Sequence, residues 1–271
     1  MELLALVLLV GTLPTGGVAP QAPDPAPIAE VHLDLVPSSF DDRYVGCVGA
    51  MEEELEHLNR SEFANNSIYA QAWTIAADEW RSRRARIPQP PALRPEHATA
   101  ILAYTQQGPL HGVFNAAVRE GGRSRRQYLD VFRFKALHFL LSEALRVLRD
   151  ARPSRCHRVY RGIRGIRFTA REHQLMRFGH FASASLRNES AAPFGRDTLF
   201  SVETCYGVAI RDFSFYPEED EVLIPPFESF EVTRVARDGE RALIELRSQN
   251  ALNIYNCEWV QGDVWGGMGW G

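Results

Sequence analysis

The chain has 271 residues, of which 45% are hydrophobic and 24% are charged, and its formal net charge is −4. This composition is ordinary for a globular protein, and the length suits one large domain or two small ones. The slightly negative charge gives no electrostatic reason to expect a nucleic-acid partner.

The N-terminus has the pattern of a secretory signal peptide. Residues 1–20 contain a short apolar stretch, Leu3 to Val10, which is too short to span a bilayer and is followed by small residues. Residues 21–32 form a proline-rich lead-in that we expect to be extended and poorly ordered. We expect residues 33–259 to form one domain and residues 260–271 a glycine- and tryptophan-rich tail. That tail lacks the hydrophobic stretch of a GPI-type anchor signal, so the sequence predicts a secreted monomer without a membrane anchor.

Glycosylation sequons and cysteines fit an exported chain. The sequence contains three sequons, at Asn59, Asn65 and Asn188. It contains four cysteines, which are Cys47, Cys156, Cys205 and Cys257. Two disulfides are therefore expected, and on the residues alone three pairings are open. Because the sequence has no Cys-x-x-Cys spacing, we expect neither a zinc site nor a thioredoxin-type site.

From about Asp41 to Asp150 the hydrophobic periodicity is mostly helical. Residues 67–77 place apolar side chains three and four positions apart, which predicts a helix. A second helix is predicted from Pro95 to Tyr104, since proline is tolerated at the first helical position. The strongest pattern predicts one long helix from Tyr128 to Leu148, which has a long apolar stripe and no glycine or proline.

After Pro153 the pattern changes from helical to alternating. Alternating or β-branched stretches predict strands at 158–162, 181–186, 200–210, 222–224 and 230–235. Residues 232–246 predict a hairpin that turns at Asp238-Gly239. Helices followed by strands indicate an α+β fold, in which residues 33–150 are mainly helical and residues 151–259 mainly β.

An acidic run, Glu218-Glu219-Asp220-Glu221, stands directly before the apolar stretch 222–224. In an extended chain Glu219 and Glu221 would share one face, with their Cα atoms roughly 6.6 Å apart, while the other two acids would point to solvent. Taken alone, the run is better interpreted as a solvated loop, because runs of charge are usually solvated.

Two other short stretches change that interpretation. VYRG places Arg161 at the end of a predicted strand, and Gly162 allows a ligand to approach the backbone closely. FASAS places Ser183 and Ser185 on one face of a second strand. Alone, Arg161 would be taken as a surface ion-pair residue and Ser183 as a strand hydroxyl bonded to backbone. An arginine, a serine and a Glu-x-Glu in this order resemble the arginine–serine–Glu-x-Glu class of mono-ADP-ribosyltransferases, in particular the vertebrate secreted or cell-surface enzymes.

The resemblance extends from about Leu33 to Trp259 and includes FNAAVRE, VYRG, FGHFASAS, TLF and EDEVLIPPFESFEV. One departure is Ala184, where the family often has threonine. The resemblance implies a helical N-terminal region packed on a two-sheet NAD-binding core. It implies transfer of ADP-ribose from NAD to arginine side chains of target proteins, with no metal. It also implies the disulfides Cys47–Cys257 and Cys156–Cys205.

The resemblance also assigns a role to each site residue. Glu221 would stabilise an oxocarbenium-like transition state at the NAD ribose, and Ser183 would hold Glu221 or the ribose in place. Arg161 would bind the phosphate–ribose region of NAD. Glu219 would grip the acceptor guanidinium and take its proton. The remaining NAD-binding residues would be Tyr160, Gly162 and Phe194.

Three alternatives stay open on the sequence. An NAD glycohydrolase would use water in place of the guanidinium, and the presence of Glu219 argues against it. A secreted glycosidase also uses two carboxylates, but these usually come from separate elements. A non-catalytic secreted binding protein on the same fold is disfavoured only because all the reactive positions are present.

Overall fold

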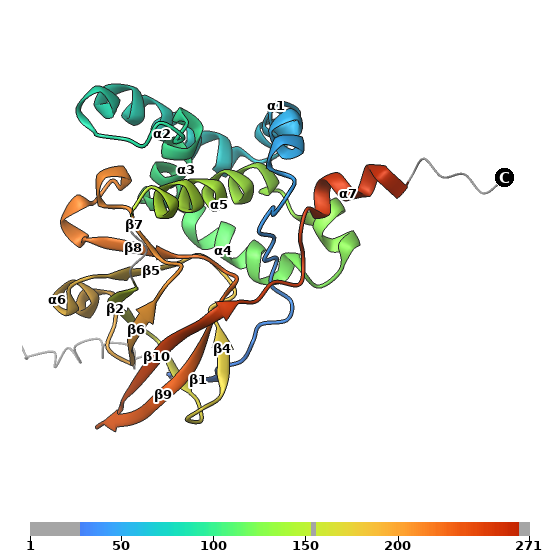
Figure 1. The fold of residues 1–271 in the computed structure, drawn as a ribbon. Helices are drawn as coiled ribbons and strands as arrows, with labels where there is room; N and C mark the ends of the chain where they lie inside the picture. Colours follow the sequence, from blue (N-terminus) through green and yellow to red (C-terminus); the bar gives the residue numbers. More distant parts are fainter. Residues whose placement is uncertain (1–27, 153–155, 266–271) are drawn as a thin grey trace, which may run out of the picture.

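The computed structural model describes residues 28–152 and 156–265. The expected signal peptide and most of the lead-in, residues 1–27, lie outside the described residues, as do residues 266–271 of the tail. The long helices gather on one side of the molecule and most strands on the other (Figure 1). The helices come first along the chain, which confirms the predicted α+β fold.

The first half of the chain builds the helical layer. Its helices are α1 (Val48–Asn65), α2 (Ser67–Arg83), α3 (Pro95–Thr105), α4 (Leu110–Gly121) and α5 (Lys135–Asp150), with a 3₁₀ turn, η1 (Arg84–Arg86), after α2. Helices α3 and α5 are buried over most of their length, and one hydrophobic cluster continues from them to Phe181 and Leu223 in the β region. The helical layer and the sheet therefore share a core.

The predicted long helix from Tyr128 to Leu148 is wrong in its first third. Gln127–Val131 forms a π-helical turn (η2), the chain then leaves helical geometry, and α5 begins at Lys135. The carboxylate of Glu62, from α1, accepts hydrogen bonds from the backbone N–H groups of Lys135 (2.7 Å) and Ala136 (3.0 Å). This carboxylate satisfies the free N–H groups at the start of α5 and complements the helix dipole. Because Glu62 is distant in sequence from Lys135, the residues around Lys135 do not themselves indicate that a helix begins there.

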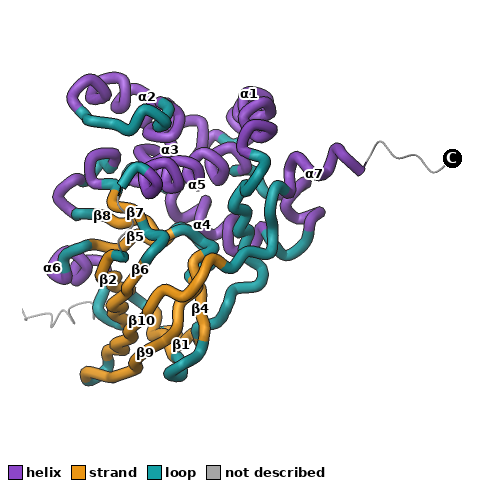
Figure 2. The backbone as a smooth tube through the Cα atoms, in the orientation of Figure 1, coloured by secondary structure: helices purple, strands orange, loops and turns teal. Residues whose placement is uncertain are grey.

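The large sheet has eight strands in the order β4-β9-β10-β6-β2-β5-β8-β7. Its strands are β2 (His157–Ile163), β4 (Leu175–Arg177), β5 (Ala182–Ser185), β6 (Thr198–Thr204), β7 (Val208–Ala209), β8 (Glu221–Ile224), β9 (Glu228–Asp238) and β10 (Arg241–Ala251). Strands β6 and β10 pair in parallel, and the other neighbours are antiparallel. A two-stranded parallel sheet joins β1 (Ala29–His32) to β3 (Ile166–Thr169). Figure 2 shows the strands gathered below the helical layer.

Three sequence predictions need correction. Residues 29–32, expected to be poorly ordered, form β1. The expected tail begins inside helix α7 (Glu258–Trp265). The hairpin loop lies one residue later than predicted, because Asp238 pairs with Arg241 and leaves Gly239-Glu240 as the loop.

The stretch 200–210, predicted as one strand, is two strands joined by a turn. The buried carboxylate of Glu228 organises this turn: Oε1 accepts the backbone N–H groups of Cys205 (2.8 Å) and Tyr206 (3.2 Å), and Oε2 accepts the Thr204 hydroxyl (2.6 Å). A buried carboxylate needs such partners, because burial without them is costly. The chain therefore turns between β6 and β7, where the alternation of apolar and polar residues predicts one continuous strand.

Two disulfides, Cys47–Cys257 and Cys156–Cys205, are present. They are the pairs that the family resemblance implies. The second bridge lies one position beyond the end of the β2–β6 ladder. It therefore fastens the strand that carries Arg161 to its neighbour.

Candidate active site

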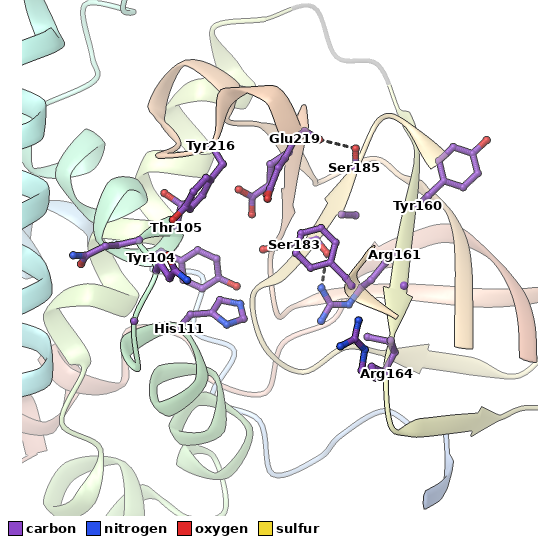
Figure 3. A pocket seen from close by; sticks show the side chains of 18 residues that line it. Tyr104, Thr105, His111, Tyr160, Arg161, Arg164, Ser183, Ser185, Tyr216 and Glu219 are labelled. Carbon is purple, nitrogen blue, oxygen red and sulfur yellow. Dashed lines mark hydrogen bonds between the residues drawn. The ribbon is translucent and has the colours of Figure 1, made fainter. Parts of the chain in front are cut away.

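A cavity of about 730 Å³ opens between the helical layer and the sheet. The end of α3 and the start of α4 form one wall, and β2, β5 and the approach to β8 form the other (Figure 3). All seven residues that the sequence assigns to the site line this cavity: Tyr160, Arg161, Gly162, Ser183, Phe194, Glu219 and Glu221. Three stretches that lie far apart in the sequence thus meet at one place.

Arg161 of β2 provides positive charge inside the cavity. Its Nη1 donates a hydrogen bond to the main-chain oxygen of Ser183 on β5, and Figure 3 shows the guanidinium pointing into the cavity. Burial and the neighbouring Arg119 lower the pKa of Arg161, but an arginine side chain stays charged at neutral pH. A half-buried guanidinium that faces a cavity suits a phosphate, to which it can donate two parallel hydrogen bonds.

Tyr160, Gly162 and Phe194 also line the cavity, but none of them places a charged group in it. Tyr160 precedes Arg161 on the strand, so its side chain points to the opposite face, and Figure 3 shows its ring turned away from Arg161. Tyr160 therefore lines the cavity with its backbone atoms. Gly162 is buried beside Arg161. Phe194 ends the 3₁₀ turn η3 (Ala192–Phe194), which follows the short helix α6 (Asn188–Ala191), and remains 55% exposed.

The acidic run is not extended, as predicted from the sequence, but folds as a turn. Pro217–Glu219 forms a 3₁₀ turn (η5), Asp220 has a left-handed backbone with φ of +46°, and β8 begins only at Glu221. Asp220, expected to be solvated, instead forms ion pairs with Arg187 and Arg211. The carboxylates of Glu219 and Glu221 nevertheless line the same cavity.

Glu221 is 6% exposed. Burial raises its pKa to about 7; the hydroxyls of Ser183 and Ser214 and the charge of Arg161 oppose the rise, and Glu219 adds to it. Ser214, which follows the 3₁₀ turn η4 (Arg211–Phe213), donates from Oγ to Oε2 of Glu221 at 3.4 Å. Near neutral pH the carboxyl of Glu221 therefore exists in both protonation states.

Glu219 is only half-buried. Burial raises its pKa, and the adjacent Glu218 adds to the rise. The two cavity carboxylates therefore differ in their access to solvent.

Sequence reasoning missed the helical wall of the cavity. This wall is lined by Tyr104, Thr105, Gln106, Gln107, Gly108 and His111. Burial lowers the pKa of His111, so its imidazole is neutral at neutral pH. Asn115, which stands in the quoted stretch FNAAVRE, donates from Nδ2 to the Tyr104 hydroxyl at 3.0 Å. The stretch FNAAVRE was the only quoted part of the sequence that pointed to this wall. It contains neither Tyr104 nor His111.

Within residues 28–152 and 156–265, no group of three or more histidine, cysteine, aspartate or glutamate side chains could hold a metal ion.

The sequence profile of the family described as NAD:arginine ADP-ribosyltransferase matches residues 33–253. The chicken erythroblast NAD(P)(+)–arginine ADP-ribosyltransferase is 50% identical over 259 residues, covering 96% of this chain and 85% of the relative. The human GPI-linked NAD(P)(+)–arginine ADP-ribosyltransferase 1 is 49% identical, covering 86% of this chain and 75% of the relative.

A solved structure is also similar. The crystal structure of the eucaryotic mono-ADP-ribosyltransferase ART2.2 has a TM-score of 0.74 and 36% sequence identity, and covers 84% of this chain and 99% of that chain. Variants of that enzyme have been solved in complex with NADH and with NAD.

The fold and the family match thus define a mono-ADP-ribosyltransferase. The chain belongs to the NAD:arginine ADP-ribosyltransferase family, and its activity is the transfer of ADP-ribose from NAD to arginine. This confirms the family, the enzyme class and the co-substrate that the sequence motifs indicate.

Proposed function

We propose that two carboxylates divide this reaction between them: Glu221 acts on the NAD donor and Glu219 on the arginine acceptor. The observation that carries the proposal is their unequal burial in one cavity. Glu221 is 6% exposed at the start of β8, whereas Glu219 is half-buried on the turn before it.

On the donor side, the bond between the ribose C1′ and the nicotinamide nitrogen breaks, and its electron pair leaves with nicotinamide. The leaving group is neutral, so the step needs no general acid. Positive charge develops on the ribose, and a fixed, ionised carboxylate beside it lowers the barrier. Glu221 supplies that charge, and Ser183 helps to hold Glu221 ionised through its hydroxyl.

The cavity offers groups for the rest of the NAD molecule. Arg161 binds the phosphates, because a guanidinium matches phosphate oxygens in charge and geometry. The backbone of Gly162 and its neighbour Tyr160 faces the nicotinamide carboxamide, and the exposed ring of Phe194 stands beside the nicotinamide.

On the acceptor side, an arginine guanidinium is protonated and therefore a poor nucleophile. The carboxylate of Glu219 binds the guanidinium and takes its proton as the bond from guanidine nitrogen to C1′ forms. The raised pKa of Glu219 makes it a better base for this step.

We further propose that the protein is secreted and glycosylated. Asn65 and Asn188 are exposed, whereas Asn59 is half-buried and its Oδ1 accepts a hydrogen bond from the Tyr69 hydroxyl at 2.7 Å. Glycans are therefore expected at Asn65 and Asn188 before Asn59. The described part of the chain has no helix able to cross a membrane. Because the human relative is GPI-linked, release of the expressed protein from cells by a phosphatidylinositol-specific phospholipase would contradict secretion without an anchor.

The division of labour is tested with Glu221→Gln and Glu219→Gln, which keep side-chain size. Glu221→Gln should lose both nicotinamide release and transfer to a small guanidine, because the charge at the ribose is lost. Glu219→Gln should lose transfer and keep NAD hydrolysis. Glu189→Gln is the matched control, since this exposed acid is not among the residues that line the cavity. If Glu219→Gln and Glu221→Gln lose both activities equally, the division is wrong.

A further inference from the structure

The Glu219 backbone is held by a serine of the neighbouring strand. Ser185, the last residue of β5, donates a hydrogen bond from Oγ to the main-chain oxygen of Glu219 at 2.6 Å. The same hydroxyl accepts the backbone N–H of Arg187 at 3.0 Å. Ser185 is 5% exposed and lines the cavity, and its hydroxyl makes both of these hydrogen bonds within the turn.

Arg187 grips the residues on both sides of Glu219. Its Nη2 donates to the main-chain oxygen of Glu218, and its Nε lies 3.0 Å from Oδ2 of Asp220. Arg211 approaches the other carboxylate oxygen of Asp220 at 3.5 Å. Ser185 and Arg187, which we call the turn clamp, therefore contact the three consecutive residues 218–220.

The turn needs such support. The backbone of Asp220 lies in the left-handed region, with φ of +46°, which is unfavourable for a residue with a Cβ and is tolerated best by aspartate and asparagine. The direction of the Glu219 side chain depends on this backbone. Backbone hydrogen bonds from Glu219 to Tyr216 and from Leu186 to Asp220 remain without the clamp. Loss of the clamp is therefore expected to shift the Glu219 carboxylate and to leave the turn folded.

Glu221 is held independently of the clamp. Its main chain pairs with that of Ser185 in the β5–β8 ladder, and its carbonyl oxygen accepts the N–H of Ile210 at 2.9 Å. A substitution that removes only the Ser185 hydroxyl leaves these backbone bonds in place. The clamp can therefore affect Glu219 without displacing Glu221.

We propose that Ser185 and Arg187 are positioning residues that aim the Glu219 carboxylate at the acceptor guanidinium, and so set the ratio of transfer to NAD hydrolysis. This inference rests on the proposed role of Glu219. Neither residue acts on the reacting atoms, and the effect is expected on the acceptor alone.

The test compares Ser185→Ala and Arg187→Gln with the unmodified protein, at matched folding by circular dichroism. Nicotinamide release and ADP-ribosylated guanidine are measured together over a range of acceptor concentrations. The transfer-to-hydrolysis ratio should fall roughly fivefold or more, the factor that corresponds to about 1 kcal/mol for one lost hydrogen bond. The KM for the acceptor should rise, and the KM for NAD should stay unchanged.

Two kinds of variant make the result specific. Ser185→Thr keeps the hydroxyl and should restore the ratio. Ser229→Ala is the matched control: Ser229 is also buried and donates from Oγ to a main-chain oxygen, that of Asn250, at 2.8 Å, but it is not among the cavity residues. If Ser185→Ala does not fold, Asp220→Asn tests the same clamp, because it keeps a residue tolerant of this backbone and removes the charge that Arg187 contacts.

The outcomes separate the clamp from the proposed function. An unchanged ratio in the Ser185, Arg187 and Asp220 variants, with transfer lost in Glu219→Gln, overturns the clamp and leaves the role of Glu219 intact. Transfer retained in Glu219→Gln overturns the proposed function, and the clamp with it. Equal loss of both activities in folded clamp variants shows an effect on Glu221 and also overturns the clamp.

Discussion

Tyr104 of helix α3 donates a hydrogen bond from Oη to the main-chain oxygen of Phe181 at 2.7 Å. Nδ2 of Asn115, in α4, lies 3.0 Å from the same oxygen and 3.0 Å from the Tyr104 hydroxyl. Phe181 directly precedes β5, the strand that carries Ser183. Two helices therefore fix the position of a strand of the active site, and the helical layer contributes to its construction.

This relationship predicts the effect of Tyr104→Phe. The substitution removes two buried hydrogen bonds, one to the main-chain oxygen of Phe181 and one from Asn115, and should lower the free energy of unfolding by on the order of 2 kcal/mol. It should also lower kcat/KM for NAD several-fold, because the support of β5 is weakened. Tyr69→Phe is the control: Tyr69 is equally buried and donates to Asn59 at 2.7 Å, in the helical layer. Urea unfolding with nicotinamide release checks both variants, and an equal activity in the two would argue against the role of Tyr104.

The pKa of Glu221, raised to about 7 by burial, predicts the pH dependence of NAD cleavage. The ionised carboxylate is the reactive form, so kcat/KM for NAD should rise with pH, pass its midpoint near pH 7 and level off above it. Ser214→Ala removes a hydrogen bond that favours the ionised form and should move the midpoint to higher pH. A profile that stays flat from about 1.5 pH units below that midpoint to about 1.5 pH units above it would be incompatible with this assignment.

The same pKa predicts a pH-dependent stability for Glu221→Gln. The folded-state pKa lies above the ordinary value of 4.5, so the carboxyl favours folding when protonated, and this contribution is lost as pH rises from about 4.5 to about 7. Glutamine does not titrate. The variant should match the unmodified protein near pH 4.5 and be more stable above pH 7, by on the order of 3 kcal/mol. Thermal unfolding across this range measures the difference, with the exposed Glu189→Gln as control; a constant difference would refute the burial argument.

The Cys156–Cys205 bridge predicts that reduction disturbs the active site. The bridge closes a 49-residue separation, for which the chain-entropy account gives about 4 kcal/mol of stability. It fastens β2, and hence Arg161, to β6. The Cys156→Ser, Cys205→Ser variant should lose both stability and NAD cleavage. The Cys47→Ser, Cys257→Ser variant, with a separation of 210, should lose as much stability or more while its folded fraction keeps NAD cleavage. Full activity in reductant, with all four thiols titrated as free, would show that activity does not require the Cys156–Cys205 bridge.

The candidate site was largely predictable from sequence because its sheet side depends on local motifs. Arg161 and Ser183 lie within β2 and β5, Glu221 begins β8 and Glu219 lies on the turn before it, and the structure places all four in one cavity. The predicted place of Arg161 at the end of its strand is wrong, because β2 continues to Ile163. The helical wall could not be predicted, because Tyr104 and His111 reach the cavity only through packing of α3 and α4 against the sheet.

The fold errors also come from distant partners. Glu62 starts α5 where the apolar stripe predicts a continuing helix, and Glu228 bends the chain where alternation predicts one strand. In the acidic run, Pro217 and the ion-paired Asp220 replace extended geometry by a turn. In each case a carboxylate bonds to residues distant in sequence. The spacing of apolar residues within a segment gives no information about such partners.

The division of labour between Glu219 and Glu221 is tested most directly by incubating the purified, disulfide-intact protein with NAD and a small guanidino acceptor, while nicotinamide and ADP-ribosylated acceptor are measured together. Both products are expected from the unmodified protein, with the acceptor product lost in Glu219→Gln and both products lost in Glu221→Gln. Nicotinamide without acceptor product would indicate an NAD glycohydrolase and contradict the role of Glu219. Neither product from a folded sample would contradict the catalytic account and favour a binding protein on the same fold.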